Sequence, residues 1–174
     1  MLKDLPYDTL RDFTPVTLMV IVPGVMTMNP KVPAKNLKEV IALAKAKPSS
    51  LNYGSPGPLT SGHLSMEMLK LTAGINIQHV PYEGGAPAIA ESGVPGFDTY
   101  EWYGVFAPGK LPKDVLAKLS REIARIIKLP DMSEKLSAQG AIPVGNTSDE
   151  FAAFVKREMD TWGKVAQQVG LKPD

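Results

Sequence analysis

Apolar and β-branched residues in the first half of the chain predict an alternation of strands and helices. Residues 13–28 have the β-branched content of one or two strands, broken at a central Pro-Gly pair. Residues 37–44 place apolar side chains at i, i+3, i+4 and i+7, which predicts a helix that Pro48 closes. Short apolar runs at 51–53 and 75–81 predict two further strands.

A second helix is predicted between these last two strands. Leu64, Met68 and Leu71 fall at helical spacing and are expected to form its buried stripe, and Gly74 is expected to end it. The resulting order of strand, helix, strand, helix and strand is typical of parallel βαβ units with right-handed crossovers. The sequence therefore predicts an α/β fold with a parallel or mixed sheet flanked by helices.

Helical periodicity dominates the second half of the chain. An aromatic-rich strand is expected at 100–107, a strongly amphipathic helix at 113–129 and a shorter helix at 130–140. A short strand at 141–144 comes before residues 147–150, Thr-Ser-Asp-Glu, which form a capping box for the last helix with the glutamate at N3. The expected apolar faces of the two longer helices consist of Leu116, Leu119, Ile123, Ile126, Ile127, Phe151, Phe154, Val155, Trp162, Val165 and Val169.

The segment 51–64 combines a strand, a Gly/Pro-rich loop and a hydroxyl-capped helix start. Small residues such as Gly57 let the backbone approach a ligand closely, and the first helical turn offers unpaired N–H groups at a positive dipole end. Ser55, Thr60 and Ser61 add hydroxyl groups at the same place. The pattern is typical of an anion site, but an ordinary loop with Thr60 or Ser61 as helix N-cap fits the same residue types.

A second glycine-rich turn follows the strand at 75–81. Gly84 and Gly85 can bring main-chain N–H groups to a carboxylate oxygen, and Tyr82 is placed to line the same cleft. A turn with the tyrosine packed on the sheet is the alternative. Any helix that begins at Pro87 is expected to last only one or two turns, because glycine and proline residues follow at once.

Composition excludes several kinds of site. With 174 residues, 44% of them hydrophobic, the chain can form one globular domain or two small lobes. A net charge of +1 without a basic run gives little support for a nucleic-acid partner. The absence of cysteine removes thiol catalysis, disulfides and thiolate metal sites, and two histidines are too few for a histidine-rich metal site. We therefore expect no metal and no cofactor.

Membrane and export signals are also not expected. The longest nearly apolar run, residues 16–28, is interrupted by polar and turn residues and falls short of the ~20 apolar residues that a spanning helix needs. No signal-peptide pattern follows Met1. We therefore expect a soluble chain.

Other chemistry-bearing residues are interpreted as structural. Ser61 and His63 are the only hint of hydrolase chemistry, but residues two apart on a helix do not face each other and no Gly-x-Ser-x-Gly motif is present. Trp102 and Tyr103 are expected to pack in the core rather than to contact a ligand. The methionines Met19, Met26 and Met28 are expected to fill the core rather than to capture a metal. No enzymatic activity is predicted.

Seven motifs follow one another along the chain. They are Leu-Pro-Tyr-Asp at 5–8, Asp-Phe-Thr-Pro-Val at 12–16, the segment 51–64, His-Val-Pro-Tyr-Glu-Gly-Gly-Ala-Pro-Ala at 79–88, the segment 91–97, Trp-Tyr-Gly-Val-Phe-Ala-Pro at 102–108 and the segment 140–145. In this order and register they closely resemble the Bug/TctC family, the substrate-binding proteins of tripartite tricarboxylate transporters. The resemblance covers essentially the whole chain.

This resemblance implies a two-lobed Venus-flytrap receptor of the type II periplasmic-binding-protein class, without catalysis. Its ligand would be a small di- or tricarboxylate held by hydroxyl and main-chain N–H donors, its partners the membrane permease subunits, and its location the periplasm. The implied organisation is a residual first-lobe segment and crossover at 1–28, a truncated second lobe at 29–93, and the crossover return with a C-terminal first-lobe segment at 94–174.

The chain departs from the family pattern at two places. The strand and loop that open the family's first lobe do not precede Met1, and the junction at Pro87 and Ala88 resembles an in-frame deletion within the second lobe. Such a loss would leave sheet edges and an apolar face exposed, so we expect a homodimer or larger assembly that covers them, for example by domain swapping. The alternative function is a remnant without transport activity that acts as a self-associating or partner-binding module.

Overall fold

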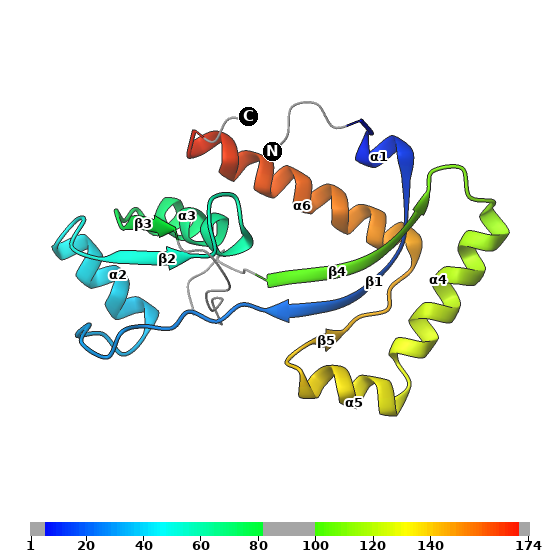
Figure 1. Ribbon diagram of the computed structural model, residues 1–174, viewed down its shortest axis with the longest axis horizontal. Helices are drawn as coiled ribbons and strands as arrows, with labels where there is room; N and C mark the ends of the chain where they lie inside the picture. The colour runs from blue at the N-terminus through cyan, green and yellow to red at the C-terminus, as the bar shows by residue number, and fades with distance from the viewer. Residues whose placement is uncertain (1–5, 82–99, 171–174) are drawn as a thin grey trace. The chain divides into compact units, whose positions relative to one another are not determined.

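The computed structural model describes residues 6–81 and 100–170, which group into two compact units (Figure 1). Among the described residues, the first unit contains 6–22 and 101–164, and the second contains 23–81, Tyr100 and 165–170. The short helix expected after Pro87 lies outside the described residues. The division into lobes at 1–28, 29–93 and 94–174 stays a prediction.

The first unit is built on a three-stranded sheet with the order β4-β1-β5. These strands are β1 (Phe13–Pro23), β4 (Tyr100–Pro108) and β5 (Ile142–Pro143). Strand β1 pairs with β5 antiparallel, with Val20 opposite Pro143 and Ile21 opposite Ile142. The β-branched run therefore forms one strand that ends at the proline, and this strand does not join the parallel βαβ unit that the sequence predicts.

Four helices belong wholly or largely to this unit: α1 (Thr9–Asp12), α4 (Lys113–Ile127), α5 (Pro130–Ala138) and α6 (Ser148–Gln168). In the core, Phe151 of α6 is fully buried and its ring lies against Trp102 and Phe106 of β4. Trp102 also meets Phe154 edge to face at 5.4 Å. The expectation of a core position is confirmed for Trp102 but wrong for Tyr103, which is 52% exposed.

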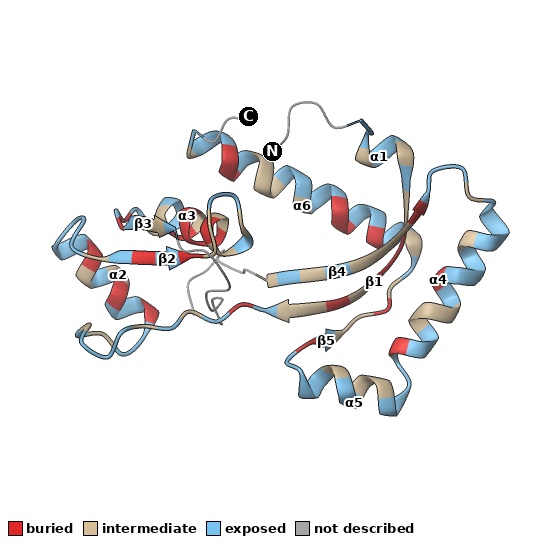
Figure 2. Ribbon diagram, viewed as in Figure 1, coloured by how far each residue is buried: buried red, intermediate tan, exposed pale blue. Residues whose placement is uncertain are grey.

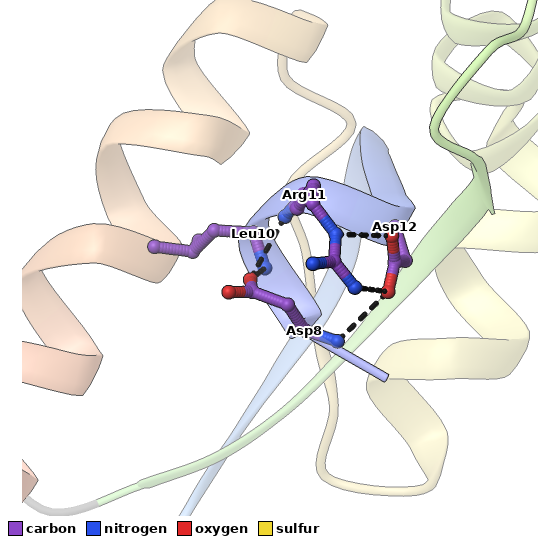
Figure 3. A network of polar contacts seen from close by, with 4 residues as sticks. All are labelled: Asp8, Leu10, Arg11 and Asp12. Carbon is purple, nitrogen blue, oxygen red and sulfur yellow. Dashed lines mark hydrogen bonds and ion pairs between the residues drawn. The ribbon is translucent and has the colours of Figure 1, made fainter. Parts of the chain in front are cut away.

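The capping box of α6 is confirmed. The Thr147 main-chain N–H donates to Glu150 Oε2 at 2.8 Å, and the Glu150 N–H donates to Thr147 Oγ1 at 3.3 Å. At the other end of the unit's sequence, the short helix α1 is capped by Asp8, whose Oδ1 accepts from the N–H groups of Leu10 and Arg11 (Figure 3).

A bidentate ion pair completes the α1 turn. Arg11 donates through Nε and Nη2 to the two carboxylate oxygens of Asp12, each at 2.7 Å, and the Asp8 N–H donates to Asp12 Oδ2 at 2.8 Å (Figure 3). The hydrogen bonds from Arg11 and then from the Asp8 main chain lower the pKa of Asp12 to about 2. The carboxylate therefore stays charged across the neutral range.

Helix α4 is amphipathic, as predicted, but part of its apolar side is exposed, and most of the helix is coloured as exposed or intermediate in Figure 2. Only Ser120 and Ile127 of this helix are buried. Val115, Leu119 and Ile126 are 39%, 39% and 41% exposed, so the expected burial of Leu119 and Ile126 is wrong in the described structure.

The second unit consists of α2 (Leu37–Ala46), β2 (Asn52–Ser55), α3 (Ser61–Ala73) and β3 (Gln78–Pro81). Strands β2 and β3 pair in parallel across the α3 crossover, as the sequence predicts, with Tyr53 opposite His79 and Ser55 opposite Pro81. The core is an apolar cluster drawn from both helices, from β2 and from the segment that joins α3 to β3. It contains Leu37, Val40, Ala44, Tyr53, Met66, Leu69, Ile75 and Ile77, with Met26 and Met28 packed against it.

Helix α3 turns a different face to the core from the one expected. It ends at Gly74, as predicted, where a φ of +61° lets the glycine act as the C-cap. Its buried residues are His63, Ser65, Met66, Glu67 and Leu69, whereas Leu71 is 42% exposed. Of the expected stripe, Met68 packs against the core cluster, but Leu71 does not. The sequence does not predict the burial of Glu67, which is possible because Tyr53 of β2, distant in sequence, donates to its carboxylate.

Candidate functional site

The loop between β2 and α3 contains two residues with positive φ, Gly57 at +137° and Leu59 at +63°. Glycine adopts such a conformation easily, but a leucine does so only when its surroundings hold it there. The sequence-predicted residues Ser55, Gly57, Thr60 and Ser61 all lie in this loop or at its ends, so the structure brings these four together.

Ser55 is 1% exposed, and its hydroxyl group already has partners within the loop. Its Oγ lies 2.7 Å from His79 Nε2, 3.1 Å from the Gly57 carbonyl oxygen and 3.2 Å from the Gly57 nitrogen, whose N–H donates to it. This hydroxyl group therefore shapes the turn at Gly57.

Thr60 is the N-cap of α3, the alternative that the residue types leave open. Its Oγ1 accepts from the His63 N–H at 3.4 Å and donates to the Gly57 carbonyl oxygen at 2.8 Å. Ser61 is the first residue of the helix. The first turn of α3 thus stands at the end of the glycine-containing loop, the arrangement that the sequence predicts for an anion site. Tyr82, Gly84 and Gly85, the other predicted ligand-binding residues, lie outside the described residues.

Two stacked histidines contact the loop, His63 on α3 and His79 on β3. The rings of His63 and His79 are 4.2 Å apart between centroids and 15° from parallel, and the Tyr53 ring stacks on His79 at 4.9 Å. His63 Nδ1 accepts from the Leu59 N–H at 3.0 Å, while His79 Nε2 meets Ser55 Oγ. Each ring therefore holds a different residue of the loop.

A hydrogen-bonded trio lies beside the histidines. The Tyr53 hydroxyl group donates to Glu67 Oε1 at 2.7 Å, and Lys70 Nζ donates to the same oxygen at 2.7 Å. Glu67 is 9% exposed, so its carboxylate is a buried charge with two donors.

Burial and charge shift the pKa values of these groups. Burial lowers the pKa of His63, and the positive charges that His79 and Lys70 can carry lower it further. Burial and Lys70 likewise lower the pKa of His79, although Glu67 opposes both shifts. For Glu67, burial favours the neutral acid, but the hydrogen bonds from Lys70 and Tyr53 outweigh it and the pKa falls below its usual value. Burial, together with the Glu67 anion, raises the pKa of Tyr53. The cluster is thus poised with Glu67 charged and both imidazoles neutral at pH 7.

Sequence reasoning missed the structural roles of His79, Tyr53, Glu67 and Lys70. Spacing gives part of the signal, because His63 and Glu67 are four residues apart on one helix face. The rest depends on the parallel register of β2 and β3, which places Tyr53 opposite His79. That register cannot be predicted from a single sequence.

The contacts of His63 and the burial of Ser55 argue against hydrolase chemistry. His63 Nδ1 is occupied by the Leu59 amide, and Ser55, the serine that does meet a histidine nitrogen, is almost completely buried. A serine nucleophile has to reach its substrate, which this burial prevents.

A cavity of about 290 Å³ opens beside the loop within the second unit. Its walls are mainly apolar, and Pro56 and Gly62 of the loop border it. The other lining residues come from the segment 26–32, from α2, from β2 and the residue before it, from α3 and from the residue before β3. They are Met26, Thr27, Met28, Asn29, Val32, Val40, Leu51, Asn52, Tyr53, Gly54, Met66 and Ile77. The methionines thus line a cavity as well as packing on the core.

Two further searches apply to residues 6–81 and 100–170. No helix there has the length and apolar character needed to cross a membrane. Within the same residues, no group of three or more histidine, aspartate or glutamate side chains is arranged to hold a metal ion.

Comparison with known proteins decides the family. Residues 1–91 and 85–171 match the sequence model described as the tripartite tricarboxylate transporter family receptor, TctC. The chain belongs to the TctC family. Its curated relatives include protein BugT of Bordetella pertussis, which is 26% identical in an alignment 219 residues long. This alignment covers 99% of this chain and 67% of BugT. A UPF0065 protein in the tcbD-tcbE intergenic region of Pseudomonas sp. strain P51 is 26% identical, with coverage of 95% of this chain and 64% of the relative.

Solved structures of TctC-type proteins confirm the fold class. R. palustris Rpa4515 with adipate has 27% sequence identity and a TM-score of 0.78, over 100% of this chain and 74% of that chain. A structure described as a periplasmic transporter has 32% identity and a TM-score of 0.71, over 99% and 73% of the two chains. The periplasmic binding protein BugD, at 22% identity and a TM-score of 0.73 over 100% and 75%, supports the fold alone. The chain therefore has an incomplete version of the predicted periplasmic-binding-protein fold.

The TctC comparisons also concern the junction at Pro87 and Ala88. The chain spans about two thirds of the length of the two curated relatives described above. The alignment with the Pseudomonas relative is 214 residues long, although this chain has only 174, so residues of the relative have no counterpart here. The two stretches that match the family model overlap at 85–91. This overlap coincides with the junction that the sequence identifies.

Proposed function

We propose that this chain binds a small carboxylate, as the receptor component of a tripartite tricarboxylate transporter located in the periplasm. Membership of the TctC family over nearly the whole chain carries the proposal. The adipate in the Rpa4515 structure, at 27% identity, favours a di- or tricarboxylate as the ligand class. Delivery to membrane permease subunits is part of the same proposal.

The loop 55–61 is the proposed centre of recognition. It ends at the first turn of α3, where main-chain N–H groups lack intrahelical acceptors and the dipole favours an anion. We propose that Ser55, Gly57, Thr60 and Ser61 form one side of the site and that Tyr82, Gly84 and Gly85 contribute to it. The hydroxyl groups of Ser55 and Thr60 act mainly by holding the loop in shape, because both already bond to Gly57.

Calorimetric titration with adipate, succinate and citrate tests this function. We expect binding of at least one of them, and a roughly 2- to 10-fold loss of affinity for Ser55→Ala and for Thr60→Val, since each removes a hydroxyl group that bonds to Gly57 and shapes the loop. Thr60→Ser keeps the cap and should bind as the unaltered chain does. Ser50→Ala is the matched control, because the Ser50 hydroxyl group bonds to the Lys47 carbonyl oxygen outside the loop.

The titrations distinguish a wrong site assignment from a wrong function. Binding that Ser55→Ala and Thr60→Val leave unchanged would mean that the carboxylate binds elsewhere. No binding of any of the three acids by a folded chain would contradict the receptor function itself. Melting curves of each variant establish that it is folded.

A second candidate function is self-association of a shortened receptor. The apolar side of α4 favours it, because Val115, Leu119 and Ile126 are each more than a third exposed on one helix. We propose that a second copy of the chain covers this face in a homodimer or larger assembly, for example by exchange of equivalent elements. Light scattering on a sizing column should give a dimer mass that Leu119→Lys with Ile126→Lys reduces to a monomer. A monomer in the unaltered chain would contradict this function.

A further inference from the structure

The contact between His63 and Leu59 fixes the protonation state of one ring nitrogen. A main-chain N–H can only donate, so His63 Nδ1, 3.0 Å from the Leu59 nitrogen, must carry a lone pair. In a neutral imidazole one nitrogen accepts and the other donates, whereas both donate in an imidazolium. The observed loop therefore requires the neutral ring of His63, with its proton on Nε2.

Leu59 is the residue of the loop that most depends on such support. Its φ of +63° lies in the left-handed region, where the β-carbon of an L-residue is crowded by backbone. Its side chain is 37% exposed, so it is held less firmly by burial than a leucine of the core. When the hydrogen bond to His63 is lost, the preference of leucine for negative φ favours a different loop backbone.

We propose that His63 is a positioning residue for the loop 55–61: the neutral ring holds Leu59 in place, and protonation of His63 releases it. The loop is thereby coupled to the proton concentration. This inference concerns the loop itself and does not depend on a ligand.

The groups that face His63 determine when release happens. From β3 it faces His79, from β2 the Tyr53 ring at 6.5 Å between centroids, and on its own helix it lies near Glu67 and Lys70. His79 can take a proton without losing Ser55, because a protonated Nε2 donates to Ser55 Oγ while the serine donates to Gly57. Protonation of His79 therefore preserves its contact, whereas protonation of His63 breaks one.

The two rings consequently titrate in order. His63 is 7% exposed and His79 is only partly buried, so His79 accepts the first proton more readily. That charge, stacked 4.2 Å from His63, opposes a second proton. The pKa of His63 is lowered by burial and then by the charge of His79, which agrees with this order. The loop stays in place at neutral pH and opens only in acid, as the second ring titrates.

Nuclear magnetic resonance on the ligand-free chain tests the proposal directly. The chain has only two histidines, so both ring titrations can be followed without ambiguity. Hydrogen exchange at the Leu59 amide, corrected for the intrinsic effect of pH, should rise roughly 2- to 10-fold as His63 titrates, the factor expected for one lost hydrogen bond. It should not rise as His79 titrates. A Leu59 amide that stays equally protected while His63 becomes protonated would overturn the proposal.

Three variants sharpen the test. In His63→Asn the side-chain oxygen can take the place of Nδ1 and cannot be protonated, so Leu59 should be protected at every pH. In His63→Phe the ring remains but the acceptor is gone, and Leu59 should exchange fast at every pH. His79→Phe removes the opposing charge, so release should shift to higher pH. If a variant fails to fold, the titration of the unaltered chain still decides the matter.

An extension to ligand binding rests on the proposed function. If the loop binds adipate, the affinity for adipate should fall as the pH is lowered through the range in which His63 becomes protonated. It should not fall in His63→Asn. An affinity that rises as the pH is lowered would contradict the extension. It would mean that the charge of the imidazolium attracts the anion more strongly than release of the loop weakens the site. A chain that binds no carboxylate contradicts the proposed function, while the exchange of the Leu59 amide still reports on the loop.

Discussion

Gly104 on β4 lies so close to the ring of Phe151 on α6 that no side chain fits between them. A β-carbon built on this glycine would come within 3.0 Å of three ring atoms of Phe151. Phe151 is fully buried against Trp102 and Phe106. The ring therefore has little room to retreat, and the packing of α6 on the sheet requires glycine at this position.

Gly104→Ala should destabilise the first unit by about 1–3 kcal/mol, the usual cost of overpacking a well-filled core. Urea unfolding followed by tryptophan fluorescence measures this well, because Trp102 and Trp162 both belong to that unit. Gly163→Ala on α6 is the matched control. Apart from its chain neighbours and the backbone of its own helix, no atom lies within 4 Å of its added β-carbon, and alanine in a helix should add about 0.5–1 kcal/mol of stability. Equal effects of the two changes would contradict the packing described here.

Removing the Tyr53 hydroxyl group should destabilise the second unit. Tyr53→Phe leaves the buried Glu67 carboxylate with one fewer donor, which costs about 1–3 kcal/mol. Hydrogen exchange of amides in β2 and α3 measures the change in the free energy of unfolding. Tyr103→Phe serves as the control, since Tyr103 is 52% exposed and its hydroxyl group bonds to Glu101 at the surface at 3.3 Å. Only the first substitution should reduce protection.

Acid should weaken the second unit in two separate pH ranges. The pKa of His63 and His79 lies below the unfolded value of 6.5, so the unfolded chain binds more protons and stability falls as the pH drops below 6.5. The pKa of Glu67 lies below 4.5, so its contribution is present above that pH and is lost as the pH falls through the folded value. Glu67→Gln should remove the lower range and leave the upper one. Unfolding measured from pH 8 to pH 3 checks both ranges.

Local rules in the sequence predict the helices of this protein better than their buried faces. The C-cap at Gly74 and the capping box at 147–150 depend on neighbouring residues and are present as predicted. Thr60 is the N-cap, one of the two residues that the sequence allows for this role. The buried face of α3 is not, because Glu67 is acceptable there only with Tyr53 and Lys70 as donors. Likewise, the apolar periodicity of residues 113–129 predicts helix α4, but it does not predict which of the apolar residues are buried.

The candidate site shows the same division. The loop 55–61 is recognisable because glycine, proline and hydroxyl residues are concentrated between a strand and a helix. The contact of Ser55 with His79 joins residues 24 positions apart and follows from the parallel pairing of β2 with β3. The αL conformation of Leu59 has no sequence signal, since glycine or asparagine is the usual residue there.

Thr17 should prove a sensitive position in β1, although it is a polar residue in an apolar strand. It is fully buried, and its hydroxyl group donates to the Asn146 carbonyl oxygen at 2.6 Å, while the Leu18 N–H donates to Asn146 Oδ1 at 2.8 Å. Thr17→Val keeps the shape of the side chain but leaves that carbonyl group without this donor, so the first unit should lose about 1–3 kcal/mol. Thr17→Ser keeps the hydroxyl group and loses a methyl group, which should cost about 1 kcal/mol. Tryptophan-monitored urea unfolding measures both, and a valine variant as stable as the unaltered chain would show that the hydrogen bond contributes nothing.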